Sequence, residues 1–135
     1  MIIYAIEERV TLEEFRAILV SSSLGERRPI DDEETLHSML KHANLIVTAR
    51  DMGKLVGISR SLTDFMFCTY LSDLAVDEEY QKMGIGTELI RQTKLATPKA
   101  NLILLSAPKA VHYYPKIGMT KWEQCYVLDD VNKLK

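Results

Sequence analysis

The chain has 135 residues, of which 47% are apolar and 27% charged, and its formal net charge is −2. This length suits one domain with a sizeable core, and the composition is ordinary for a soluble globular protein. The small negative charge gives no reason to expect nucleic acid or an acidic membrane as a partner. No apolar run approaches the roughly 18 residues of a membrane-spanning helix, and the N-terminus lacks the pattern of a secretory signal. We therefore expect a single cytoplasmic domain over residues 1–135.

Residues that could bind a metal are scattered along the chain. The two cysteines, Cys68 and Cys125, lack metal-ligand spacing. The three histidines do not cluster with them: they are His37, His42 and His112. We expect no metal, and we interpret the cysteines as reduced, mostly buried thiols.

The first part of the chain is predicted to form one strand and two helices. Residues 2–8 are the opening strand. Thr11 and Glu14 make a capping box, in which the hydroxyl accepts a helix-end N–H and the carboxylate reaches back. The inward face of this first helix consists of Leu12, Phe15, Ile18 and Leu19. Asp31 or Asp32 caps the second helix, whose inward residues are Leu36, Met39, Leu40 and Ala43.

Three consecutive strands are predicted next. Residues 44–50 and 55–61 form an antiparallel hairpin around a turn at 51–54. A second turn, at Thr63 and Asp64, leads into a long fourth strand over residues 65–77.

The stretch after this fourth strand carries the strongest pattern in the chain. A loop with Gln81, Gly84 and Gly86 precedes a helix whose inward face consists of Ile85, Leu89, Thr93 and Ala96, with Leu95 beside them. A second apolar run at residues 102–106 completes a strand–helix–strand unit, so the two strands should be parallel.

The two glycines of this loop favour an anion-binding site. They remove side chains where the helix begins, which lets a ligand approach the backbone closely. The N–H groups of residues 82–87 would lie at the positive end of the helix dipole, where a phosphate or pyrophosphate binds well. A plain tight turn would also use glycines. The position between a strand and a helix, inside such a unit, favours the anion site.

The last part of the chain is predicted to contain a short helix and a closing strand. Pro108 suits the first turn of a helix that runs to Tyr114, and Gly118 marks the turn out of it. Residues 119–128 are predicted to form the closing strand, and residues 129–135 are expected to fray. The order is strand, helix, helix, three strands, helix, strand, helix, strand.

Two motifs resemble those of one known family. Gln81-x-x-Gly84-x-Gly86, five residues after Val76, is similar to the acetyl-CoA-binding signature of the GNAT superfamily of N-acetyltransferases. The block Ala110-Val-His-Tyr-Tyr-Pro-Lys-Ile-Gly-Met119 resembles the family's Ala-x-x-Phe-Tyr-x-Lys-x-Gly-Phe pattern. Both occur in the family's order and spacing. The resemblance implies the GNAT fold, an α/β (α+β) architecture with a mixed sheet of six or seven strands and about four helices.

The resemblance also implies a reaction and a binding site. The reaction would move an acetyl group from acetyl-CoA to a primary amine of a small molecule or peptide, by direct attack in a ternary complex. The pantetheine arm would pair with the backbone of Leu74, Ala75 and Val76, as an added strand does, while the side chains of this strand pack in the core. The pyrophosphate would lie near the Gln81 side chain, on the amides of Lys82, Met83, Gly84, Ile85, Gly86 and Thr87. Homodimers are common in the family, and that analogy is the only pointer to an assembly.

The resemblance identifies catalytic residues less directly than it identifies the cofactor-binding residues. Tyr114 matches the family tyrosine that protonates the thiolate of coenzyme A, although an amphipathic core aromatic is the alternative. Asp73 is a candidate general base, directly or through water, but acids on strands are also often structural hydrogen-bonding groups. Arg27 and Arg28, between the first two helices, would meet a carboxylate or phosphate of the substrate, or remain solvated in a loop.

Two other functions compete with an acetyltransferase. An acyl-CoA-binding regulatory module without turnover is supported by Ala107, where the family often has asparagine, and by Pro115, which disfavours helical geometry at Tyr114. A Rossmann-type nucleotide binder would place its glycines after the first strand, whereas these follow the fourth. The sequence does not identify the amine acceptor.

Overall fold

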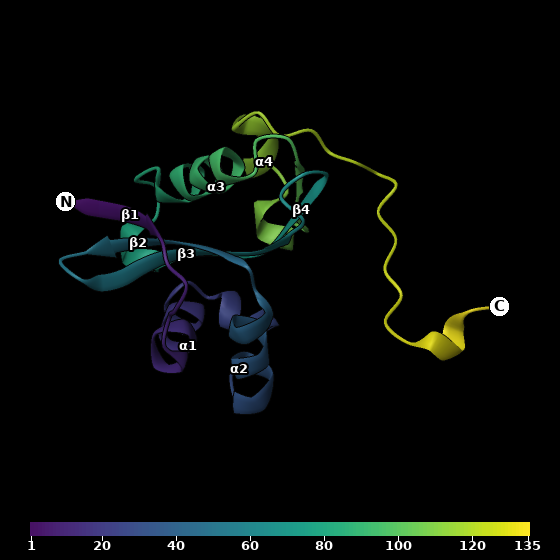
Figure 1. Ribbon diagram of the computed structural model, residues 1–135, viewed down its shortest axis with the longest axis horizontal. Coiled ribbons are helices and arrows are strands. Elements are labelled where there is room, and N and C mark those ends of the chain that lie inside the picture. The colour runs from purple at the N-terminus through teal and green to yellow at the C-terminus, as the bar shows by residue number, and fades with distance from the viewer. The chain divides into compact units, whose positions relative to one another are not determined.

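In the computed structural model, which describes residues 1–135, the chain forms two units. Residues 1–105 carry the sheet and three α-helices, and residues 106–135 carry one short α-helix followed by a segment that is mostly without regular structure (Figure 1). None of the helices combines the length and the apolar character that crossing a bilayer requires.

The sheet of the first unit is mixed, as predicted. Its five strands are β1 (Ile2–Ile6), β2 (Leu45–Asp51), β3 (Lys54–Thr63), β4 (Cys68–Val76) and β5 (Asn101–Ile103). They lie in the order β1-β2-β3-β4-β5, and the first three pairs are antiparallel. β4 and β5 are parallel, which confirms the predicted strand–helix–strand unit.

Helices cover both faces of this sheet. Helices α1 (Leu12–Ser21) and α2 (Glu33–His42) lie on one side, and α3 (Ile85–Ala96) lies on the other (Figure 1). The predicted capping box is confirmed, because Thr11 Oγ1 accepts the Glu14 N–H at 3.1 Å. Of the two aspartates considered as caps for α2, Asp32 caps it by accepting the Thr35 N–H at 3.0 Å.

Two apolar clusters form the core, one on each face. The cluster under α1 and α2 includes Phe15, Ile18, Leu19, Leu36, Ile46 and Ile58. The cluster under α3 consists of Val47, Ala49, Val56, Ile85 and Leu89. Gly57 permits close approach of α3, since a Cβ there would lie 3.1 Å from Ile85 Cγ2 and from Leu89 Cδ1. Leu95, expected beside the inward face of α3, is instead 64% exposed.

β4 carries an irregularity near its middle. Ser61 of β3 pairs with Leu71 and Arg60 pairs with Asp73, so Ser72 has no counterpart on β3. This is a β-bulge, which bends the strand locally. On its other side β4 pairs with β5 only from Cys68 to Tyr70. Beyond Tyr70, the outer edge of β4 therefore has no neighbouring strand in the sheet.

The second unit differs from its prediction. After a 3₁₀ turn at Pro108–Ala110 and helix α4 (Tyr113–Lys116), the chain continues without helix or strand, with a turn at residues 123–124, to a last 3₁₀ turn at Val131–Lys133 (Figure 1). The closing strand predicted at residues 119–128 is wrong, because these residues form no strand. The sheet therefore has five strands rather than six or seven.

The ends of β4 and β5 also differ from prediction. β4 begins at Cys68 rather than at residue 65. Asp64 Oδ1 accepts the N–H groups of Met66, Phe67 and Cys68, which holds these residues in a turn. β5 ends at Ile103 rather than at residue 106, where its pairing with β4 stops.

Candidate functional site

Side chains hold the first part of the loop between β4 and α3, from Asp77 to Gln81. Asp77 Oδ1 accepts the Glu79 N–H at 2.9 Å and starts a 3₁₀ turn at Glu78–Tyr80. The Tyr80 hydroxyl donates to Asp51 Oδ2 at 2.8 Å. Gln81 Nε2 donates to the Val76 carbonyl at 3.0 Å, which folds the loop back onto the end of β4. The glycine segment that follows therefore starts from a fixed position.

The glycine segment leaves open space at the start of α3. Gly84 is the residue before the first helical turn, with φ +81°, and no atom lies within 4 Å of the position that its Cβ would occupy. N–H groups at the start of a helix have no acceptor within that helix, and the dipole there is positive. Lys82, also in the left-handed region at φ +65°, adds a cationic side chain. These features fit a pyrophosphate group.

The end of β4 presents main chain at its open edge. The side chains of Leu74 and Val76 pack in the cluster under α3, and Ala75 packs in the cluster on the other face. All three residues pair with β3 on one side only. The Val76 carbonyl is engaged by Gln81. The remaining backbone groups directed away from β3 can pair with an extended, amide-containing ligand.

A buried cluster of charges lies at the bulge, and we call it the arginine clamp: Arg28, Arg60 and Asp73. Asp73 is fully buried, and its Oδ1 accepts from Arg28 Nε at 2.6 Å while its Oδ2 pairs with Arg60 Nε. Both arginines also donate to Ser72. Arg28 Nη2 donates to the Ser72 carbonyl at 2.9 Å, and Arg60 Nη2 donates to Ser72 Oγ at 3.0 Å. The clamp therefore fixes the carboxylate and the bulge together.

The two arginines predicted to meet the substrate occupy different environments. Arg28 is committed to the clamp, and its Nη1 also donates to the Arg27 carbonyl at 2.9 Å. Arg27 ends the 3₁₀ turn Leu24–Arg27 and is exposed. Sequence reasoning missed Arg60. The signal was available, since alternation puts Arg60 on the same face as buried Ile58, and a buried charge requires a partner.

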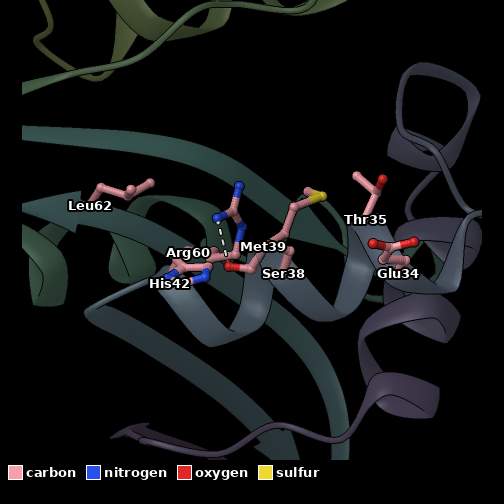
Figure 2. A pocket seen from close by; sticks show the side chains of 7 residues that line it. All are labelled: Glu34, Thr35, Ser38, Met39, His42, Arg60 and Leu62. Atoms are coloured by element: carbon pink, nitrogen blue, oxygen red, sulfur yellow. Dashed lines mark hydrogen bonds between the residues drawn. The ribbon is translucent and has the colours of Figure 1, made fainter.

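A cavity of about 410 Å³ lies between α2 and the end of β3. Its lining consists of Glu34, Thr35, Ser38, Met39, His42, Arg60 and Leu62 (Figure 2). Arg60 Nη1 donates to the Met39 carbonyl at 3.0 Å, so the cavity adjoins the arginine clamp. Sequence reasoning missed this cavity because most of its α2 residues, all except Met39, lie on the polar, exposed side of that helix.

Tyr114 lies in α4, in the second unit. Its ring meets that of Tyr113 edge to face, with centroids 5.3 Å apart. Burial raises the pKa of Tyr114, and Tyr113 raises it further. The phenol therefore carries its proton at neutral pH, as a proton donor must. The expectation that Pro115 disfavours helical geometry here is wrong, because Pro115 falls in the first turn of α4, where no helix hydrogen bond is lost.

The cysteines differ from expectation. Cys68 and Cys125 are free, but both are exposed rather than buried. No three side chains of the His, Cys, Asp or Glu type come together in a group that could hold a metal ion.

Comparisons with known proteins agree on one family. A model of the Acetyltransferase (GNAT) family matches residues 12–119. The chain is 28% identical over 94 residues to GCN5-related N-acetyltransferase 2, chloroplastic, of Arabidopsis thaliana, and 27% identical over 90 residues to the uncharacterized N-acetyltransferase ycf52 of Porphyra purpurea. These matches cover 62% and 61% of this chain but 36% and 51% of the relatives. The chain thus spans about a third to a half of the length of these curated relatives.

One solved structure has the same fold over nearly its whole length. It is an acetyltransferase of the GNAT family from Streptococcus pneumoniae, with a TM-score of 0.78 and 24% identity. The similarity covers 99% of this chain and 100% of that one. At this identity the likeness establishes the fold.

Proposed function

Because the chain belongs to the GNAT family of acetyltransferases, we propose that it transfers the acetyl group of acetyl-CoA to a primary amine. The acceptor is a small molecule or a peptide, and it attacks directly in a ternary complex. The family implies acetyl-CoA as the co-substrate. The observation that carries the proposal is the open space at Gly84, at the start of α3 and beside the unpaired edge of β4.

The co-substrate is held mainly by backbone groups. The amides of residues 82–87 bind the pyrophosphate, and the open edge of residues 74–76 pairs with the pantetheine arm. Gln81 supports this site by fixing the loop to the Val76 carbonyl. Backbone binding leaves the side chains of β4 free to pack in the core on both faces.

Catalysis needs an oxyanion donor and a proton for the leaving thiolate. We assign the first role to a main-chain N–H at the end of β4, near Val76. Tyr114 supplies the proton, and its raised pKa keeps it protonated until the thiolate departs. We assign Asp73 to positioning rather than to proton abstraction, since both of its carboxylate oxygens are paired with arginines. Solvent then takes the proton of the attacking amine.

The acceptor binds on the side of the sheet that faces α2. The cavity there offers the Glu34 carboxylate and the hydroxyls of Thr35 and Ser38 to an amine-bearing molecule (Figure 2). Arg27, which is exposed, remains available for an anionic group of the acceptor. Arg28 acts through the clamp instead.

We place the chain in a reducing compartment, the cytoplasm. Cys68 and Cys125 are exposed thiols, and a reducing compartment keeps such thiols reduced. The net charge of −2 favours neither nucleic acid nor an acidic membrane as a partner.

Release of the coenzyme A thiol in the presence of an amine panel tests the activity. We expect thiol release that depends on one class of amine. Acetyl-CoA at about 100 times its Kd should also stabilise the fold by about 2.7 kcal/mol in a thermal-shift assay. Stabilisation without thiol release for any amine would instead support a regulatory acyl-CoA-binding module.

Tyr114→Phe tests the proton donor. We expect turnover to fall by about tenfold or more while the KM for acetyl-CoA stays nearly constant, because the variant loses only the hydroxyl. Tyr113→Phe is the matched control on the neighbouring ring and should retain activity. Equal rates for Tyr114→Phe and the unmodified protein would remove the assigned role.

Gly84→Leu tests the anion site. A side chain there would occupy the open space at the start of α3, so we expect the Kd for acetyl-CoA to rise by about tenfold or more. Gly53→Leu is the control, because Gly53 also has a positive φ, +87°, and open space, but lies in the β2–β3 turn. Similar losses of affinity in both variants would show that strain, rather than the site, is responsible.

A further inference from the structure

Two carbonyl groups of β4 that could serve its open edge are already occupied by side chains. The Asp77 N–H donates to β3 at 2.9 Å, so the Val76 carbonyl, which belongs to the same peptide group, points away from β3. Gln81 Nε2 occupies this carbonyl at 3.0 Å. At the bulge, the Ser72 carbonyl accepts from Arg28 Nη2 at 2.9 Å. The open part of the edge therefore lies between two capped carbonyls.

Strand alternation identifies the backbone groups that remain between these caps. Leu74 lies two residues before Val76, so its N–H and its carbonyl also point away from β3. Asp73 and Ala75 direct theirs toward β3, with which they pair. A ligand at this edge thus meets the N–H of Val76 and both groups of Leu74. In the proposed site the diphosphate lies at the start of α3, so the pantetheine arm enters at Val76 and its acyl end lies toward Ser72.

The Arg28 guanidinium is held firmly at that acyl end. Its Nε donates to Asp73 Oδ1 at 2.6 Å, its Nη1 to the Arg27 carbonyl at 2.9 Å and its Nη2 to the Ser72 carbonyl at 2.9 Å. All three guanidinium nitrogens are therefore engaged, and the side chain is only 23% exposed. Moving it would deprive the buried Asp73 carboxylate of one of its two arginines, which is costly.

We propose that Arg28 restricts the acyl group of the co-substrate to acetyl. This inference rests on the proposed function, in which the arm carries its acyl group along β4 toward Ser72. A longer acyl chain extends into the space that the guanidinium occupies. Such a chain either displaces Arg28 from Asp73 or places methylene groups against a charge, and both are unfavourable. Acetyl is short enough to leave the ion pair intact.

Affinities for a series of acyl-CoA molecules test this restriction without an acceptor amine. The Kd values of acetyl-, propionyl- and butyryl-CoA are measured by isothermal titration calorimetry. We expect the unmodified protein to bind acetyl-CoA about tenfold or more tightly than butyryl-CoA. Arg28→Ala opens the end of the edge, so the ratio of the two Kd values should fall to near one. A ratio that Arg28→Ala leaves unchanged would overturn the proposal.

Further variants separate the restriction from the structural role of the clamp. Arg28→Gln keeps a donor for Asp73 but is shorter and uncharged, so it should also lower the ratio, and it serves if Arg28→Ala does not fold. Arg27→Gln is the matched control, because the Arg27 side chain is exposed and should leave the ratio unchanged. A loss of affinity that is equal for all three acyl-CoA molecules would assign Arg28 to structure alone and overturn the proposal.

The same titrations distinguish a failure of this proposal from a failure of the proposed function. If the unmodified protein binds acetyl-CoA and butyryl-CoA equally well, the restriction to acetyl is wrong while acetyl transfer stands. If it binds none of the three acyl-CoA molecules, both proposals are wrong. A preference for acetyl-CoA that is lost in Arg28→Gln and kept in Arg27→Gln is the result that we expect.

Discussion

On the face of β4 that looks toward α1 and α2, one carboxylate holds the strand. Asp73 lies between Arg28 and Arg60, and both arginines reach the bulged Ser72. On the opposite face there is no charge: Leu74 and Val76 pack in the apolar cluster with Ile85 and Leu89 of α3. The same few residues of one strand are thus fixed by ion pairs on one side and by close packing on the other.

This difference shows how the site keeps one edge of β4 open. Side chains on both faces hold the strand, so its outer edge needs no neighbouring strand for support. A buried ion pair is costly to desolvate and contributes little net stability, but its hydrogen bonds have a defined direction. We infer that the clamp fixes the geometry of the bulge, whereas the α3 face supplies apolar burial. The two faces should therefore respond differently to substitution.

Asp73→Asn removes the carboxylate of the arginine clamp and should have the largest effect on the free energy of unfolding. It leaves two arginines near the bulge without their carboxylate, so the free energy of unfolding should fall by about 3–5 kcal/mol in urea. Asp129→Asn is the control, since its ion pair with Lys133 is exposed and should contribute nothing measurable. A similarly small change for Asp73→Asn would mean that the clamp does not hold β4.

Gly57→Ala tests the apolar face and should have an intermediate effect. The added Cβ would lie 3.1 Å from Ile85 Cγ2 and from Leu89 Cδ1, so the side chains that α3 packs on the sheet must shift to make room. We expect the free energy of unfolding to fall by about 1–3 kcal/mol, and acetyl-CoA to bind more weakly because α3 begins at the anion site. Unchanged urea midpoint and affinity would show that the packing there is loose.

Asp64→Ala tests the turn before β4 and should have the smallest effect on the free energy of unfolding. Hydrogen bonds from the N–H groups of Phe67, Met66 and Cys68 lower the pKa of Asp64 to about 2 from 3.8. A carboxyl whose pKa is lowered by folding stabilises the fold above its unfolded pKa and loses that contribution as the pH falls. The gap in urea midpoint between protein and variant should therefore be full at pH 7 and narrow from about pH 4 to about pH 2. A gap independent of pH would contradict this.

The sequence predicts correctly those features whose residues lie close together along the chain. The Thr11–Glu14 capping box and the glycine loop before α3 each lie within a few residues, and both occur as predicted. The arginine clamp could not be predicted, because it depends on the register of β3 against β4 and on the bulge at Ser72. Residues 119–128 have a strand's pattern, but a pattern cannot supply the partner that a strand requires.

The central claim is that backbone N–H groups of the β4–α3 loop and the open edge of β4 bind acetyl-CoA. The most direct test is a titration of the ¹⁵N-labelled protein with acetyl-CoA, followed by amide NMR. The largest shifts should fall at residues 82–87 and 74–76, saturate together, and weaken in Gly84→Leu. Shifts centred elsewhere, such as on the cavity beside α2, or unchanged by Gly84→Leu, would contradict the claim.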